Sequence, residues 1–362
     1  MSLDRSTEIL CERLKSAKEP EEVFGALEEG PVKTQIADLR VLFKGFLLRV
    51  HPDQNPNLKD ANEYVLRLTT FRKVAETCLE AGTYGKPRKP KLDAVLHSRL
   101  GAYVVLEEFR SGEVASLLLA ETEAKKRCIL KIVRNPSDND LLDNEARVLT
   151  GLHSKVDSKA EFFRQYLPNL LDSFPMIEGG RHRRVNVFDV ADGFYSLAEI
   201  RAAYPEGLDT RDVAWMMRRT LEVLGWVHAN GIVHGAILPE HLLVHPIDHG
   251  AKLIGWSYSV PSGRKLLAMS VLRKGMYPTS VTDRKPATPV LDVQLAAETA
   301  IFLSSDEKGK LRSDVPPEVA TFLSACRAGK IKDGWEAYRD YSEVLTKSYG
   351  KRKYRAFAMP RV

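Results

Sequence analysis

One lysine of the sequence stands where a charged side chain is costly. Lys131 interrupts the apolar run 129–133, and Glu145 follows in a segment whose leucines have helical spacing. A lone buried charge would cost several kcal/mol, so Lys131 needs a partner of opposite charge. We therefore expect Lys131 and Glu145 to form an ion pair between a strand and a helix.

A second polar group is the tripeptide His51-Pro52-Asp53, which follows residues 35–50, a segment with the apolar periodicity of a helix. The proline ends helical hydrogen bonding and leaves an imidazole and a carboxylate in a loop. A capping-box pattern near residue 60 then begins a further helix. The pattern predicts two antiparallel helices joined by a charged loop. The cations of the first helix lie outside its apolar face: Arg40, Lys44 and Arg49.

Residues 20–85 resemble the J-domain of DnaJ-like co-chaperones, which carries a His-Pro-Asp loop after a basic helix. The first helix of that family would be residues 20–28 here. The resemblance implies docking on a DnaK-type chaperone ATPase through His51, Pro52, Asp53, Lys44, Arg49 and Arg40. The alternative is a chance tripeptide in a helical hairpin, with the cations on a solvated face.

The middle and end of the chain predict a small sheet followed by helices. Short apolar runs separated by charged turns predict antiparallel strands at 102–106, 115–120 and 128–133, and a hairpin turn at 178–180. Apolar spacing predicts helices at 140–152, 210–230 and 333–349. Gly231 is expected to end the second of these helices.

A third polar group lies in the run 231–244, which contains His234 and the pair Pro239-Glu240 and precedes an apolar run into Gly255. Together with Lys131 and Glu145, its order resembles the protein-kinase fold over roughly residues 99–330. Residues 187–190 resemble the hinge between the lobes, and residues 291–293 resemble the start of the central helix of the large lobe. The resemblance implies a β-rich N-lobe and an α-rich C-lobe, with His234 a buried scaffold residue.

The residues that carry chemistry in the kinase family are replaced in this chain. The resemblance places Ala236 at the catalytic base, Leu238 at the catalytic-loop lysine, His241 at the metal-binding asparagine and Gly255 at the metal-binding aspartate. Because Mg²⁺ prefers oxygen ligands, His241 is a poor substitute. The sequence therefore predicts no metal site and a pseudokinase that is not an enzyme.

The nucleotide site that the resemblance implies is vestigial. It consists of Lys131, Glu145 and Gly112, the one glycine kept of the three expected in the phosphate loop. The neighbouring Glu113 would direct negative charge toward phosphates. No cofactor is predicted, ATP binding is left open, and a structural role of the ion pair is the competing interpretation.

Composition and charge exclude several classes of protein. The 362 residues carry a net charge of +6 and are 44% hydrophobic, which excludes wholesale disorder and a disulfide scaffold. Four scattered cysteines indicate buried, reduced thiols. No stretch is long and apolar enough to span a bilayer and the start lacks a signal-peptide pattern, so we expect a cytoplasmic protein without membrane contact.

Two basic segments allow more than one interpretation. Residues 86–91 combine two prolines with four cations and predict a solvated linker rather than a nucleic-acid patch. The tail 351–357 carries cations beside Tyr354 and Phe357. It could be a solvated terminus, or it could contact RNA, an acidic partner or the body of the protein.

The sequence thus predicts an α+β chain in five parts. These are a J-domain (18–85), a basic linker (86–98), a kinase-like N-lobe (99–192), a kinase-like C-lobe (193–330) and a C-terminal helix with a basic tail (331–362). The predicted function is a co-chaperone that stimulates a DnaK-type ATPase, with the kinase-like domain holding an unknown client or acting as a scaffold. The alternatives are an atypical ATP-dependent phosphotransferase and a nucleic-acid-linked scaffold.

Overall fold

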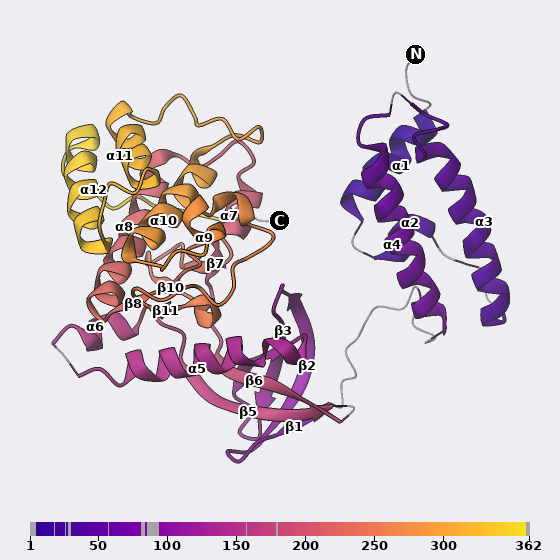
Figure 1. Cartoon of the computed structure of the whole chain (residues 1–362), viewed down its shortest axis with the longest axis horizontal. Coiled ribbons are helices and arrows are strands. Elements are labelled where there is room, and N and C mark those ends of the chain that lie inside the picture. Colours follow the sequence, from indigo (N-terminus) through magenta and orange to yellow (C-terminus); the bar gives the residue numbers. More distant parts are fainter. Residues whose placement is uncertain are drawn as a thin grey trace. The chain divides into compact units, whose positions relative to one another are not determined.

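The chain forms two compact units, Met1–Pro90 and Lys91–Val362, in a computed structural model (Figure 1). The structure describes residues 5–17, 19–25, 27, 30–56, 58–80, 84, 94–156, 158–178 and 180–359. Most of the predicted linker lies outside these ranges. The two units are described separately, and the finer domain boundaries stay predictions.

The N-terminal unit is helical in its described part. Its helices are α1 (Arg5–Ser16), α2 (Pro20–Phe24), α3 (Val32–Val50) and α4 (Ala61–Glu80). Helices α3 and α4 pack against each other, and Leu14, Leu39 and Leu68 are fully buried in the shared core. The two helices around the His-Pro-Asp loop are therefore where the sequence predicted them. The sequence did not predict α1, and α2 ends at Phe24 rather than at residue 28.

The second unit begins with a six-stranded antiparallel sheet of order β1-β2-β3-β4-β6-β5. Its strands are β1 (Val95–His97), β2 (Ala102–Ser111), β3 (Ala115–Thr122), β4 (Arg127–Val133), β5 (Leu170–Glu178) and β6 (Arg181–Asp189). Tyr103, Leu130 and Val187 belong to an apolar cluster buried by the sheet. The three predicted strands and the predicted hairpin are all present.

Helix α5 (Asn139–His153) lies between the sheet and the helical part of the same unit (Figure 1). Its buried face includes Leu142, Leu149 and Leu152, which belong to the apolar stripe that predicted the helix from the sequence. Glu145 is buried on this helix as well. A helix with a carboxylate on its buried side needs a cation on the neighbouring sheet.

The helical lobe holds the rest of the unit. Its helices are α6 (Ala160–Arg164), α7 (Leu197–Ala203), α8 (Thr210–Ala229), α9 (Thr279–Thr282), α10 (Pro289–Ser304), α11 (Pro317–Arg327) and α12 (Gly334–Tyr349). Short strands pair within it: β7 (Tyr195–Ser196), β8 (Ile232–Val233), β9 (Leu242–Val244), β10 (Ala251–Leu253) and β11 (Val260–Pro261). Three short 3₁₀ turns complete the unit: η1 (Pro136–Asp138), η2 (Trp256–Tyr258) and η3 (Lys274–Met276).

A buried carboxylate ties the helical lobe together. Asp292 of α10 has no solvent exposure and accepts hydrogen bonds from the backbone nitrogens of His234 (2.7 Å) and Gly235 (2.8 Å). It lies 3.0 Å from Nε2 of His228, and the other ring nitrogen of His228 accepts from the Gly334 backbone nitrogen at 3.0 Å. The imidazole therefore donates to Asp292, because its Nδ1 is already an acceptor. This network joins α8, α10, α12 and the loop before β9.

The basic tail contacts the body of the helical lobe. Arg355 pairs with Asp212 (2.8 Å) and Asp209 (3.1 Å). The Tyr354 ring stacks on His249 at 4.9 Å, and Phe357 is buried. The sequence allowed a solvated tail or a tail that contacts RNA, an acidic partner or the body of the protein. The structure shows contact with the body of the protein.

The four cysteines are free and buried, as the sequence predicted. Within the described ranges, no helix is long and apolar enough to cross a bilayer.

Candidate functional site

The predicted ion pair is formed in the second unit. Nζ of Lys131 on β4 lies 2.7 Å from Oε1 of Glu145 on α5, and the two side chains are 16% and 2% exposed. Lys131 also donates to the Ser257 hydroxyl at 3.0 Å. The lysine therefore connects the sheet, α5 and the segment after β10.

Hydrogen bonds from the sheet satisfy the other oxygen of Glu145. Asn186 pairs with Lys131 across β4 and β6, and its amide donates to Oε2 of Glu145 at 3.1 Å. The same amide donates to the Leu142 carbonyl at 3.0 Å, while the Ser173 hydroxyl donates to its oxygen at 2.7 Å. Such full satisfaction offsets the desolvation of a buried charge. No local pattern pointed to Asn186, because its role depends on strand register.

The loop 234–241 lies between β8 and β9, and its first histidine is a scaffold residue. His234 is fully buried, its Nε2 lies 3.0 Å from the Ile254 carbonyl oxygen, and its ring meets Trp256 edge-on. Burial lowers the pKa of His234 to about 3, so the ring is neutral at physiological pH. Asp292 holds the backbone directly before Ala236, and position 236 supplies only a methyl group.

His241 occupies the space that a side chain at position 255 would need. Gly255 has a φ of +83°, and a Cβ built on it would lie 2.6 Å from Cγ of His241. The His241 ring is partly buried, and its Nδ1 lies 2.9 Å from the Ala236 carbonyl oxygen. Desolvation lowers the pKa of His241. Because a carbonyl can only accept, Nδ1 carries the proton and the lone pair of the neutral ring is on Nε2.

These two positions do not fit Mg²⁺, the ion that the kinase fold implies. A nitrogen ligand at 241 and no side chain at 255 leave no carboxylate or amide oxygen for a cation that prefers oxygen. Among the described residues, no cluster of three or more histidine, cysteine, aspartate or glutamate side chains is arranged to hold a metal.

Gly112 lies in the turn between β2 and β3, where the sequence placed the phosphate loop. Its backbone nitrogen donates to the Ala115 carbonyl at 2.9 Å, and a Cβ there would lie 3.2 Å from the same oxygen. Glu113, which the sequence predicted to direct negative charge toward phosphates, is exposed, and its carboxylate accepts hydrogen bonds from two backbone nitrogens of the helical lobe, those of Val271 and Leu272. Sequence reasoning did not foresee that contact.

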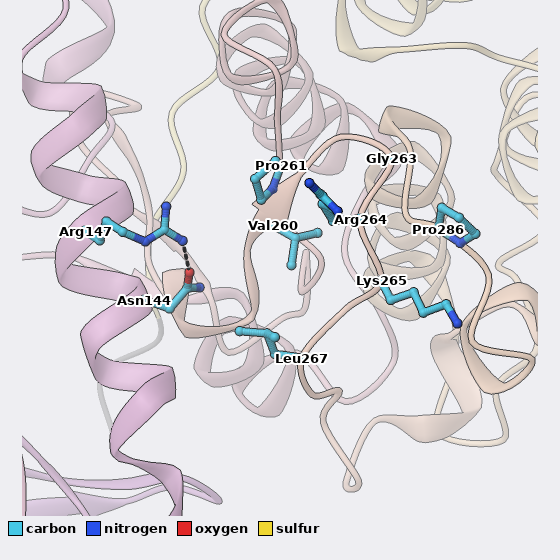
Figure 2. A pocket seen from close by; sticks show the side chains of 9 residues that line it. All are labelled: Asn144, Arg147, Val260, Pro261, Gly263, Arg264, Lys265, Leu267 and Pro286. Atoms are coloured by element: carbon cyan, nitrogen blue, oxygen red, sulfur yellow. Dashed lines mark hydrogen bonds between the residues drawn. The ribbon is translucent and has the colours of Figure 1, made fainter.

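A cavity of 580 Å³ opens beside α5 and is separate from the cleft, which is the region around Lys131, His241 and Gly255 (Figure 2). Figure 2 shows the guanidinium of Arg147 bonded to Asn144, with Arg264 on the opposite wall. Lys131, His241 and Gly255 do not line it. The residues that do are Asn144, Arg147, Val260, Pro261, Gly263, Arg264, Lys265, Leu267 and Pro286.

In the N-terminal unit, the tripeptide forms the turn that follows α3. His51 caps the helix, and the Asp53 backbone nitrogen donates to its Nδ1 at 3.2 Å. Lys44 and Arg49 are exposed on α3, whereas Arg40 is bonded to Glu76 of α4 at 2.8 Å. The three cations predicted to face a partner are therefore not equivalent, because Arg40 already has an anionic neighbour.

Arg40 and Lys44 also line a groove of 760 Å³ on α3. The other lining residues are Val32, Lys33, Ile36, Ala37, Val41 and Glu80. Apolar side chains and cations thus share one surface of the unit.

Comparisons with known proteins show the fold of the larger unit. The chain is 26% identical over 202 residues to calcium/calmodulin-dependent protein kinase type 1 of Macrobrachium nipponense, covering 53% of each chain. The kinase of the same name from Caenorhabditis elegans is 25% identical over 198 residues, or 51% of this chain and 50% of the relative. The chain therefore spans about half the length of the curated relatives that it matches. No family model matches it.

A solved structure supports the same assignment. The BubR1 kinase domain superposes with a TM-score of 0.53 at 15% identity, covering 76% of this chain and 93% of that domain. The sheet, α5 and the helical lobe thus have the protein-kinase fold. None of the three matches is named as a J-domain protein, so the N-terminal resemblance stays a prediction.

One expectation from the sequence is corrected by these comparisons. We predicted that the chain is not an enzyme, because Ala236, His241 and Gly255 replace catalytic and metal-binding residues. Both curated relatives are named protein kinases, and the fold is that of a kinase domain, which points to a kinase-type enzyme. The prediction weighed single positions, whereas the framework around them, with Lys131 and Glu145 paired, is that of a kinase.

The fit of His241 over Gly255 gives a stability prediction. We expect Gly255→Asp to lower the free energy of unfolding by about 2 kcal/mol more than Gly263→Asp, because only the first substitution meets the imidazole. Gly263 is the matched control, since its φ is +85° and a Cβ there meets no atom within 4 Å. All four tryptophans lie between residues 215 and 335, so their fluorescence during urea unfolding reports on this unit.

Adding His241→Ala should restore much of the loss in Gly255→Asp and none of the loss in Gly263→Asp. Equal losses in the two glycine variants, with no rescue, would contradict the described packing of His241.

Proposed function

We propose that the kinase-like unit binds ATP beside Lys131 and transfers its γ-phosphoryl group to a hydroxyl. The observation that carries the proposal is the 2.7 Å pair between Lys131 and Glu145. In the kinase fold, a strand lysine held by a helix glutamate is positioned to contact nucleotide phosphates. The kinase names of the curated relatives support the same class of reaction.

The transfer needs a group that accepts the proton of the attacking hydroxyl, and Ala236 cannot supply one. His241 is the group assigned to this role. Its Nδ1 donates to the Ala236 carbonyl, so the ring is oriented and Nε2 keeps its lone pair. Because the pKa of His241 is lowered below 6.5, the ring is unprotonated at neutral pH.

The reaction is balanced without another reactant. The acceptor oxygen forms a bond to the γ-phosphorus, and the bond from that phosphorus to the β,γ-bridging oxygen breaks. ADP leaves, and the hydroxyl proton moves to Nε2 of His241. Lys131 stabilises the phosphate charge during transfer.

Replacing the cleft lysine tests this proposal. With ATP labelled at the γ-phosphate, we expect the full-length protein to form ADP and a phosphorylated acceptor, and Lys131→Met to lower the rate by at least about 10²-fold. Lys126→Met is the control, because Lys126 is exposed in the turn between β3 and β4. Thermal unfolding of each variant excludes loss of the fold as the cause.

The assay is run with Mg²⁺ and with Mn²⁺. Absence of ADP formation by the wild type with both ions, or an unchanged rate in Lys131→Met, would refute the phosphotransferase proposal.

A second function, for the N-terminal unit, is recruitment of a DnaK-type chaperone and stimulation of its ATPase. The specific observation is the turn at His51, Pro52 and Asp53 between two packed helices. Exposed Lys44 and Arg49 give α3 a positive surface that suits an acidic partner. The kinase-like unit would then select the client protein of the chaperone that the N-terminal unit recruits.

The tripeptide is tested in the full chain. We expect the wild type to accelerate single-turnover ATP hydrolysis by a DnaK-type chaperone and His51→Gln to lose that acceleration, since the substitution removes the imidazole with little change of volume. Lys73→Gln on the exposed side of α4 serves as control and should stimulate as the wild type does. Equal stimulation by wild type and His51→Gln would show that the tripeptide does not act.

A further inference from the structure

The turn between β2 and β3 is bonded to a segment of the helical lobe. One carboxylate oxygen of Glu113 accepts hydrogen bonds from the backbone nitrogens of Val271 and Leu272, both at 2.8 Å. Hydrogen bonds to an ionised acceptor are roughly twice as strong as those between neutral groups. A single side chain therefore joins the sheet to residues 270–273.

Two ion pairs flank this contact. Arg110 at the end of β2 pairs with Glu199 of α7 at 2.5 Å, and Glu199 is itself fixed by the capping box with Ser196. On the other side, the Arg273 guanidinium forms a bidentate pair with Glu240 and lies over the Phe302 ring, 4.9 Å from its centroid. Residues 270–273 are thus bonded both to the β2–β3 turn and to the loop that carries His241.

The turn lies next to the strand that pairs with the Lys131 strand. Leu117 of β3 pairs with Lys131 of β4. The turn, residues 112–114, directly precedes β3. Val114 in the turn packs against apolar side chains of both the sheet side and the helical lobe. The turn is thereby bonded and packed against the helical lobe next to the strand that pairs with Lys131.

Little apolar burial holds the segment in place. The side chains of Val271 and Leu272 are 75% and 82% exposed, although their backbone nitrogens are bonded. Segments with few buried apolar contacts open locally at low free-energy cost. The hydrogen bonds to Glu113 therefore hold residues 271 and 272 on the turn, and Val114 adds apolar contact with the helical lobe.

We propose that Glu113, Arg110 and Arg273 form an intramolecular latch that closes the β2–β3 turn over the cleft and must open before a nucleotide enters. The latch is a property of the fold and does not depend on catalysis. Its effect on nucleotide entry rests on the proposed ATP binding. If only a fraction of the molecules has the latch open, the apparent affinity for the nucleotide is reduced by that fraction.

The test compares Glu113→Ala with Glu108→Ala in the full chain, because Glu108 is exposed on β2, the strand that leads into the turn. Hydrogen–deuterium exchange of peptides covering residues 270–274 measures latch opening directly. Calorimetric titration with ATP measures entry. We expect Glu113→Ala to exchange about tenfold faster in this segment and to bind ATP several-fold more tightly, with Glu108→Ala like the wild type.

Each result is decisive for one of the two ideas. Unchanged exchange in Glu113→Ala overturns the latch, and faster exchange with unchanged ATP affinity overturns its control of entry. Faster exchange with no ATP binding in any variant supports the closed contact but refutes the proposed nucleotide function.

Discussion

The ion pair between Lys131 and Glu145 is the constraint on which the cleft depends. Two charges that are almost fully buried persist only because each has a partner, and removing one partner of a buried pair typically costs about 3–5 kcal/mol. The pair fixes α5 against the sheet, and Ser257 extends it to the segment after β10. The lysine is thereby held between the sheet, α5 and this segment.

The helical lobe depends on a second buried charge, Asp292. It holds the backbone at His234 and Gly235, the two residues directly before Ala236. Residues 241 and 255 fit each other sterically, because the His241 ring fills the space that a side chain at position 255 would need. The unit therefore keeps the protein-kinase fold around positions 241 and 255, whose side chains offer no oxygen ligand.

Local patterns of the sequence predicted the local structure well. Alternating and helical apolar spacing located β2, β3, β4, α5 and α8, and the cost of a buried charge identified the Lys131 pair. Contacts between distant segments were not predicted, because nothing in the local pattern encodes them. Glu113 with Leu272, and Arg40 with Glu76, depend on how separate elements are brought together. The non-enzyme prediction was wrong for a related reason, since it judged single residues without the framework around them.

The central claim is that this cleft binds a nucleotide through Lys131 and without a metal ion held by residues 241 and 255. Calorimetric titration of ATP into the intact chain, with Mg²⁺ and with EDTA, tests it most directly. We predict similar dissociation constants in both solutions and loss of binding in Lys131→Met. Binding that requires the metal, or that survives in Lys131→Met, would contradict the account.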